Sequence, residues 1–267
     1  MLDIHGLTLL FSKGTVNEHK ALDQISLHLD KGEFVTVLGS NGAGKSSLFN
    51  AVCGTHDVES GQITLDGQDI TWMPEHKRAH FIGRLFQDPM KGTAPDMTIE
   101  ENLALAHARQ LRGPLCKAVQ KSDQKLFRDK LAEFHMGLED RMKTKVGQLS
   151  GGQRQAMTLL MATIASPKLL LLDEHTAALD PNTAETVLDI TQDIVARQGI
   201  TTMVITHNMV SALALGNRTI MMNAGKIVLD VKGKERAEMT VENLLDRFAQ
   251  NSGSRLDNDR VLLSIKK

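Results

Sequence analysis

The sequence has few of the residues that mark a disulfide-bonded, secreted or membrane-spanning protein. Its 267 residues include only two cysteines, Cys53 and Cys116, too few for a disulfide framework. No apolar run approaches the roughly eighteen residues of a membrane-spanning helix. The beginning, MLDIHGLTLLFSKG, lacks the basic start and long apolar core of a secretion signal. We therefore expect a cytosolic protein that reaches a membrane only through another chain.

An excess of either charge is also absent. The chain has 31 Lys and Arg residues and 32 Asp and Glu residues, so its net charge is −1. This balance gives no reason, over the whole chain, to expect nucleic acid or an anionic membrane surface as a partner. No internal repeat or low-complexity segment is visible, and 41% hydrophobic residues are enough to form a full core.

One glycine-rich stretch carries the first functional signal. LGSNGAGKSS, residues 38–47, follows the apolar run FVTV and matches the phosphate-binding pattern G-x-x-x-x-G-K-[ST]. Small residues let backbone N–H groups turn toward an anion, and the helix expected next directs its positive dipole end at it. A turn that binds nothing would explain the glycines but not the lysine and hydroxyl at this spacing. The nucleotide-binding residues predicted here are Gly39, Ser40, Asn41, Gly42, Ala43, Gly44, Lys45, Ser46 and Ser47, with Ser46 also a Mg²⁺ ligand.

Hydrophobic patterns around this loop predict an α/β fold. Residues 24–30, 33–39 and 61–70 have strand patterns separated by turn residues and predict an antiparallel sheet beside the loop. From about residue 88 to residue 165 the pattern becomes helical, with a capping box formed by Thr98 and Glu101.

The second half of the chain alternates strands and helices. Residues 168–174 and 201–207 are short apolar runs typical of strands buried on both faces of a parallel sheet. Asp180 and Pro181 should begin the helix between them, and residues 219–230 predict a final hairpin. The charged stretch 232–238 is expected to be a solvated loop, and residues 251–267 a polar tail.

Two further stretches suit nucleotide chemistry. Asp173 and Glu174 end an apolar strand, where the first carboxylate can contact Mg²⁺ and the second can polarise water. LSGGQ, residues 149–153, makes Ser150 the cap of a second helix whose glycine-rich beginning can approach a phosphate. If the two phosphate cradles lie too far apart in one chain, the second must come from another copy.

The ordered motifs GSNGAGKSS, LFQDP, LSGGQ, LLLLDE, TAALDP and VITHN together resemble the ATP-binding subunit of an ABC transporter over nearly the whole chain. The stretch LLLLDEHTAALDP resembles a bacterial subgroup that serves solute importers, for which amino-acid-like ligands are expected. The resemblance implies a P-loop NTPase core with a mixed sheet, an antiparallel β subdomain and an inserted helical subdomain at about 88–165. The ATP-binding domain would span 1–250.

The resemblance also implies roles for single residues. Glu174, His207 and Gln87 would be catalytic, with His207 contacting the γ-phosphate and Gln87 reaching the metal. The Mg²⁺ ligands would be Ser46, Gln87 and Asp173. Phe11 would stack on adenine, although core packing is an alternative because the following stretch is longer than usual and the chain has no tyrosine. His175 stands where proline commonly follows the acidic pair. The ATP contacts from the partner copy would come from Ser150, Gly151, Gly152, Gln153 and Asp180.

The implied assembly is a head-to-tail homodimer with ATP and Mg²⁺ between the P-loop of one copy and the LSGGQ stretch of the other. Membrane permease subunits would dock near Gln87 at the cytoplasmic face of the membrane, and an extracytoplasmic solute-binding protein would complete the system. A soluble ABC ATPase of another kind, such as one acting in iron–sulfur cluster assembly, would carry the same motifs and is the alternative.

Overall fold

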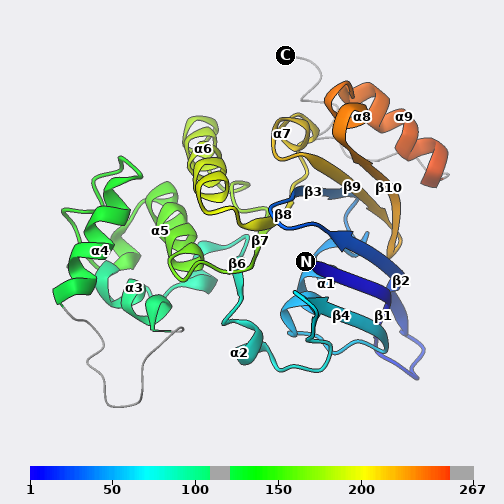
Figure 1. Cartoon of the computed structure of the whole chain (residues 1–267), viewed down its shortest axis with the longest axis horizontal. Helices are drawn as coiled ribbons and strands as arrows, with labels where there is room; N and C mark the ends of the chain where they lie inside the picture. Colours follow the sequence, from blue (N-terminus) through cyan, green and yellow to red (C-terminus); the bar gives the residue numbers. More distant parts are fainter. Residues whose placement is uncertain (109–120, 253–267) are drawn as a thin grey trace. The chain divides into compact units, whose positions relative to one another are not determined.

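The computed structural model describes residues 1–108 and 121–252, and the chain divides into two compact units. The first unit contains residues 1–78 and the chain from residue 201 onward, and the second contains residues 79–200. Cys116 and almost all of the predicted polar tail lie outside the described residues. Figure 1 shows the elements of each unit, which we describe separately.

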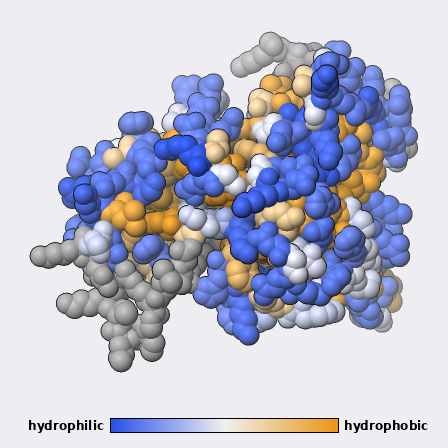
Figure 2. Space-filling model, in the orientation of Figure 1, coloured by the Kyte–Doolittle hydropathy of each residue, from blue (hydrophilic) through white to orange (hydrophobic). Residues whose placement is uncertain are grey.

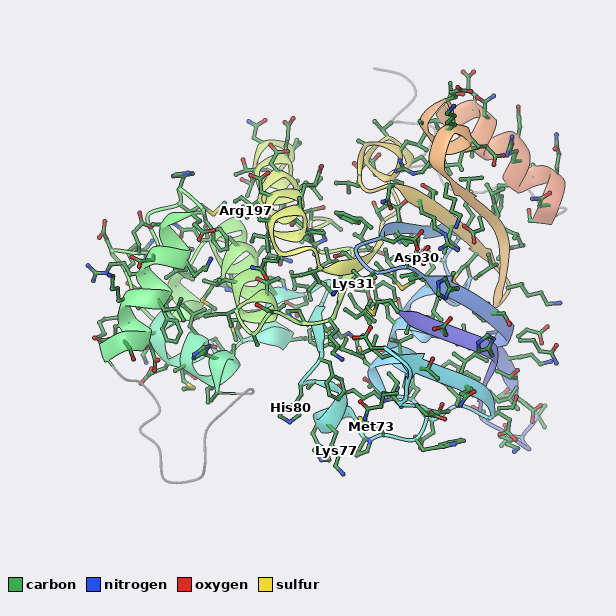
Figure 3. All side chains as sticks on the ribbon, viewed as in Figure 1. Asp30, Lys31, Met73, Lys77, His80 and Arg197 are labelled. Carbon is green, nitrogen blue, oxygen red and sulfur yellow. The ribbon has the colours of Figure 1, made fainter. Side chains whose placement is uncertain are left out.

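The first unit contains an antiparallel sheet of order β2-β1-β4-β5. Leu2 at the beginning of β1 pairs with Leu29 of β2 and with Leu65 of β4. The turn between β4 and β5 has Asp66 and Gly67 at positive φ, as the Asp-Gly signal predicts. Figure 3 shows Asp30 in the loop that follows β2. The strands are β1 (Leu2–Phe11), β2 (His19–Leu29), β4 (Ser60–Leu65) and β5 (Gln68–Asp69).

The strand before the P-loop does not belong to this antiparallel sheet, so that part of the sequence prediction is wrong. β3 (Phe34–Gly39) is parallel to β8 (Thr201–Ile205) and to β9 (Arg218–Asn223), which forms the predicted hairpin with β10 (Lys226–Lys232). All six residues of β3 are buried. This is typical of a strand in a parallel sheet, because such sheets are covered on both faces.

Five helices complete the described part of the first unit, and one of them corrects the sequence prediction. Residues 232–238, expected to be a solvated loop, contain α8, and its Arg236 is buried. Leu244 and Phe248 of α9 join an apolar cluster with Met209 and Ala212 of α7. Figure 1 shows α8 and α9, orange to red, following β10. The helices are α1 (Lys45–Cys53), α2 (Glu75–Arg78), α7 (Met209–Ala214), α8 (Gly233–Ala237) and α9 (Val241–Ser252).

The second unit is largely helical around a parallel strand pair. β6 (Ile82–Leu85) and β7 (Leu169–Asp173) pair in register, with Leu85 opposite Leu172. The predicted capping box of Thr98 and Glu101 is present. Arg197 near the end of α6 forms an ion pair of 2.9 Å with Glu133 (Figure 3). The helices are α3 (Ile99–His107), α4 (Lys121–Ala132), α5 (Gly151–Thr163), α6 (Pro181–Gln198) and the short 3₁₀ turns η1 (Pro89–Gly92) and η2 (Val146–Gln148).

Helices of the described residues are all too short or too polar to cross a membrane. The face drawn in Figure 2 is mainly hydrophilic, with apolar groups between the polar side chains. The large apolar side chains that are exposed include Trp72, Leu105 and Val210.

Candidate nucleotide and hydrolysis site

The P-loop is fixed by its packing against the backbone of its own unit. It connects β3 to α1, and Gly44 precedes α1 with φ 100°. A Cβ at Gly44 would lie 2.6 Å from the carbonyl oxygen of Ala21 in β2, so glycine is required there for both conformation and space. The loop is also held by a hydrogen bond of 3.0 Å that Gly225 N donates to the carbonyl of Ala43.

Lys45, the first residue of α1, is directed back along the loop. Its Nζ donates hydrogen bonds of 2.7 Å to the carbonyl of Gly39 and 2.9 Å to that of Ser40. Only 6% of Lys45 is exposed, so its ammonium group is held in one place beside the loop. The hydroxyl-bearing Ser46 is exposed, as are Asn41 and Gly42, and these parts of the loop remain accessible to a ligand.

The register of the parallel strands places His207 at the edge where the P-loop begins. Val37 of β3 pairs with Ile205 of β8, so His207 and Gly39 each follow this pair by two residues. Thr206 N donates to the carbonyl of Val37 at 3.2 Å, which extends the pairing toward His207. The carboxyl ends of parallel strands are the usual location of ligand sites in such sheets.

The same register argument explains the acidic pair in the second unit. Leu85 of β6 lies opposite Leu172 of β7, so Gln87 and Glu174 each follow by two residues. The structure brings these two predicted residues together, because Gln87 Nε2 donates to Glu174 Oε2 at 3.2 Å. Asp173 is the last residue of β7, and Glu174 has the left-handed φ of 46°. The chain therefore turns out of β7 at Glu174, the residue whose carboxylate is expected to orient water.

In the second unit the N-terminal ends of α5 and α6 lie close together. The sequence predicts that both contact the nucleotide of a partner copy. Ser150 caps α5 in a capping box with Gln153, and Asp180 caps α6 through a 3.1 Å hydrogen bond from Thr183 N. The hydrogen bonds that Asp180 accepts from Thr183 hold the pKa of this carboxyl below its usual value. A Cβ at Gly152 would collide with the methyl group of Thr183, so this glycine permits the close approach of α5 and α6.

The amide of Gln153 is committed within its own chain. Its Oε1 accepts from Ser150 N at 3.3 Å, and its Nε2 donates to the carbonyl of Met136 at 3.3 Å. Gly151, by contrast, has room for a side chain, because an added Cβ would lie 3.4 Å from the nearest atom of Leu179. Gly151 is therefore the position in this stretch at which a substitution can alter the surface with least disturbance of the helix packing.

Phe11 lies at the end of β1 and is 36% exposed, and its ring contacts His56 edge to face at a centroid distance of 5.3 Å. The sequence offered no signal for His56, which follows α1 in an ordinary polar turn. Part of Phe11 remains accessible, as the predicted stacking on adenine requires.

The oxygen donors predicted for Mg²⁺ belong to different units. Ser46 lies in the first unit and Gln87 and Asp173 in the second. A hydroxyl, an amide oxygen and a carboxylate are hard oxygen ligands, which suit Mg²⁺ better than a transition metal. Within residues 1–108 and 121–252, no group of three or more His, Cys, Asp and Glu side chains could hold a metal by itself.

His175 follows the acidic pair and is almost completely buried, with 3% of it exposed. Desolvation lowers the pKa of its imidazole from 6.5 to about 4. Its Nε2 lies 3.4 Å from the hydroxyl of Thr191, and that hydroxyl also donates to the carbonyl of Val187. The ring is therefore a neutral packing group beneath the acidic pair.

We expect this burial to make the fold sensitive to acid. Below about pH 6.5 the unfolded chain protonates His175, whereas the folded chain keeps it neutral until about pH 4. The free energy of unfolding should then fall by about 1.4 kcal/mol per pH unit over this window, or about 3 kcal/mol in all. Urea unfolding at several pH values, in EDTA, should show a smaller loss for His175→Leu than for the parent. Equal pH dependence of the two proteins would contradict the prediction.

Comparisons with known proteins identify the family to which the chain belongs. The profile of the ABC transporter family matches residues 22–177. The tyrosine transport ATP-binding protein of Clostridioides difficile is 44% identical over 248 residues, which cover 93% of this chain and 98% of that protein. The methionine import ATP-binding protein MetN of Corynebacterium diphtheriae is 37% identical over 257 residues, covering 94% of this chain and 72% of that protein.

A solved structure of an ATP-binding cassette is also similar. It is a dimeric post-hydrolysis state bound to ADP and Pi, with a TM-score of 0.76 and 26% sequence identity. The similarity covers 87% of this chain and 98% of that chain.

Proposed function

Because this chain belongs to the ABC transporter family and is an ATPase of that family, we propose that it drives the uptake of an amino-acid-like solute through separate membrane permease subunits. The observation that supports the solute class is the 44% identity, over 98% of its length, to a protein named for tyrosine transport. The methionine import relative supports the same class. Docked to its permeases near Gln87, the subunit would lie at the cytoplasmic face of the membrane.

We propose that Lys45 and the P-loop amides hold the ATP phosphates. The carbonyl contacts of Lys45 fix its ammonium next to the loop, so little side-chain entropy is lost when a phosphate binds. Ser46, Gln87 and Asp173 are the proposed oxygen ligands of Mg²⁺. The ion would neutralise charge on the phosphate oxygens when it is bound.

Glu174 is the proposed residue that orients water for in-line attack on the γ-phosphorus. Its hydrogen bond from Gln87 limits the directions the carboxylate can take, and an oriented water is the main requirement of this reaction. His207, at the same strand edge as the beginning of the P-loop, would donate to the γ-phosphate and stabilise the charge that develops there.

We propose further that Ser150, Gly151 and Asp180 act on the nucleotide of a second copy in a head-to-tail dimer. The joined beginnings of α5 and α6 support this role, because they present two capped helix N-termini side by side. ATP would then close the dimer and hydrolysis would reopen it, and the permeases would receive that motion. A solute-binding protein would deliver the solute outside the membrane.

Reconstituted transport tests this proposal. The chain should be co-purified with candidate permeases from its own genome, sealed into vesicles with the candidate solute-binding protein on the opposite side, and supplied with MgATP on its own side. We expect ATP-dependent accumulation of labelled tyrosine or methionine, and none with Glu174→Gln. Hydrolysis without accumulation of any amino acid would contradict the solute class. Failure to associate with any permease, with binding to cluster-assembly proteins instead, would favour the iron–sulfur alternative.

A further inference from the structure

Arg236 is a buried cation in a segment that the sequence suggested was solvated. Only 8% of it is exposed, and it lies on the short helix α8. Burial lowers the pKa of its guanidinium, and among the residues that the structure describes no carboxylate opposes this shift. A buried guanidinium is costly unless its N–H groups are all satisfied, so the partners of Arg236 show what it is there to hold.

Those partners are carbonyl groups at the C-terminal end of α7. The guanidinium Nη2 donates to the carbonyls of Ala212 at 2.8 Å and Leu213 at 3.2 Å, and also to that of Leu215. Its Nε donates at 2.9 Å to the hydroxyl of Thr219 in β9. The last carbonyls of a helix lack partners within the helix and carry partial negative charge, so one guanidinium satisfies and neutralises several of them.

The other end of α7 carries His207. Asn208 is the N-cap, accepting from Ser211 N at 3.0 Å, and α7 then runs for only six residues. Only the N-cap Asn208 lies between His207 and the first residue of α7, Met209. A change in the position of the C-terminal end of α7 is therefore passed to its N-terminal end as a tilt or translation of the whole turn.

Apolar packing and hydrogen bonds restrain α7 in different ways. Met209 and Ala212 pack against Leu244 and Phe248 of α9, which holds one face of α7 against the C-terminal elements. Non-directional contacts of this kind fix a distance but resist sliding along the helix axis less well than hydrogen bonds do. Directional restraint at this end comes from the donors of Arg236 and, just beyond α7, from the hydrogen bonds of 2.9 and 3.1 Å that join Asn217 to Phe34 of β3.

We propose that Arg236 is a positioning residue for hydrolysis: the pairing of β8 with β3 brings His207 to the edge of the sheet, and Arg236, by binding the end of α7, restrains the segment that follows His207. The inference rests on the proposed role of His207 at the γ-phosphate. It assigns a function to α8, which otherwise has no part in the ATPase site, and links the C-terminal segment to the rate of hydrolysis.

The chain contains a matched control. Arg218 is a second arginine of the same unit and is 6% exposed. It donates two hydrogen bonds of 2.8 and 2.6 Å to Asp230, one of 3.0 Å to Glu33 and one of 2.7 Å to the carbonyl of His28. None of these partners lies in α7. Arg218→Gln should therefore lower stability at least as much as Arg236→Gln while leaving α7 held by Arg236.

The experiment measures kcat and KM for MgATP in Arg236→Gln, Arg236→Lys and Arg218→Gln, at a temperature where each is folded. We expect Arg236→Gln to lower kcat about tenfold or more with KM changed less than about threefold, because misplacing a catalytic group by a fraction of an ångström acts on the transition state. Arg236→Lys should retain an intermediate kcat, and Arg218→Gln the parent kcat. Backbone hydrogen exchange across residues 207–215 should accelerate in the two Arg236 variants only.

A His207→Ala background separates this inference from the proposed function. If Arg236 acts through His207, Arg236→Gln will lower kcat no further once His207 is gone. A parent rate for His207→Ala would remove the catalytic role of His207 and this inference with it. A slow His207→Ala beside a parent rate for Arg236→Gln would overturn the inference alone, as would equal effects of the Arg236 and Arg218 variants. Should Arg236→Gln not fold, Arg236→Lys decides by the same criteria.

Discussion

Replacing Glu174 by glutamine should lower ATP turnover by about 10²–10⁴-fold, the usual loss when a positioned acid–base group is removed. ATP binding should persist, because glutamine keeps the size of the side chain and the amide oxygen can still accept the 3.2 Å hydrogen bond from Gln87. If hydrolysis reopens the dimer as we propose, the variant should also accumulate as an ATP-bound dimer. Phosphate release and light scattering measure the two effects on one sample.

Glu185→Gln is the matched control, because Glu185 is exposed on α6 and is outside every proposed contact. It should hydrolyse ATP at the parent rate. A Glu174→Gln protein that turns over within a few-fold of the parent would exclude Glu174 as the residue that orients water. A variant that is slow yet monomeric at millimolar MgATP should be tested again with its permeases. Failure to dimerise there would contradict the closure model.

Two inactive proteins should recover MgATP-dependent dimerisation when they are mixed. Lys45→Ala removes the charge from the P-loop, and Gly151→Asp places a carboxylate where the LSGGQ stretch would face phosphate, at the cost of like-charge repulsion. Each homodimer has two defective sites. A head-to-tail heterodimer has one site with both defects, and one that joins the intact P-loop of the Gly151→Asp chain to the intact LSGGQ stretch of the Lys45→Ala chain.

The structure favours Gly151 for this test, because a side chain fits there, whereas at Gly152 it would collide with Thr183 and disturb α6. Both chains should also carry Glu174→Gln, so that each restored site traps ATP and retained nucleotide counts the sites. The mixture should retain up to about half a nucleotide per chain in the heterodimer. Retention no greater than in the separate proteins, at concentrations where the Glu174→Gln parent dimerises, would show that the site is not shared.

Features with a local cause could be predicted from the sequence. Thr98, Ser150 and Asp180 cap their helices as predicted, because a cap is satisfied by backbone groups only two or three residues away. The buried strands that end near Glu174 and His207 were predicted for a similar reason, since their apolar runs are continuous and short. The residues that follow these strands were thereby placed at strand ends from sequence alone.

Features decided by partners far along the chain could not be predicted. The pairing of β3 depends on residues 201–223, which nothing in residues 33–39 specifies. Arg236 looks like a solvent-facing charge in a charged segment, and only the tertiary position of α7 makes its burial favourable. The packing role of Gly152 could not be predicted, because a sequence motif does not show which side chain, here that of Thr183, packs against a glycine.

The backbone at Glu174 has an evolutionary consequence. A left-handed φ of 46° costs a side-chain-bearing residue about 1 kcal/mol or more relative to glycine, so the backbone of that turn suits glycine better than glutamate. Selection for folding alone would favour loss of the carboxylate through drift toward glycine. Its presence in this strained turn is what selection for turnover would maintain, and a descendant freed from hydrolysis would be expected to lose it early while keeping its fold.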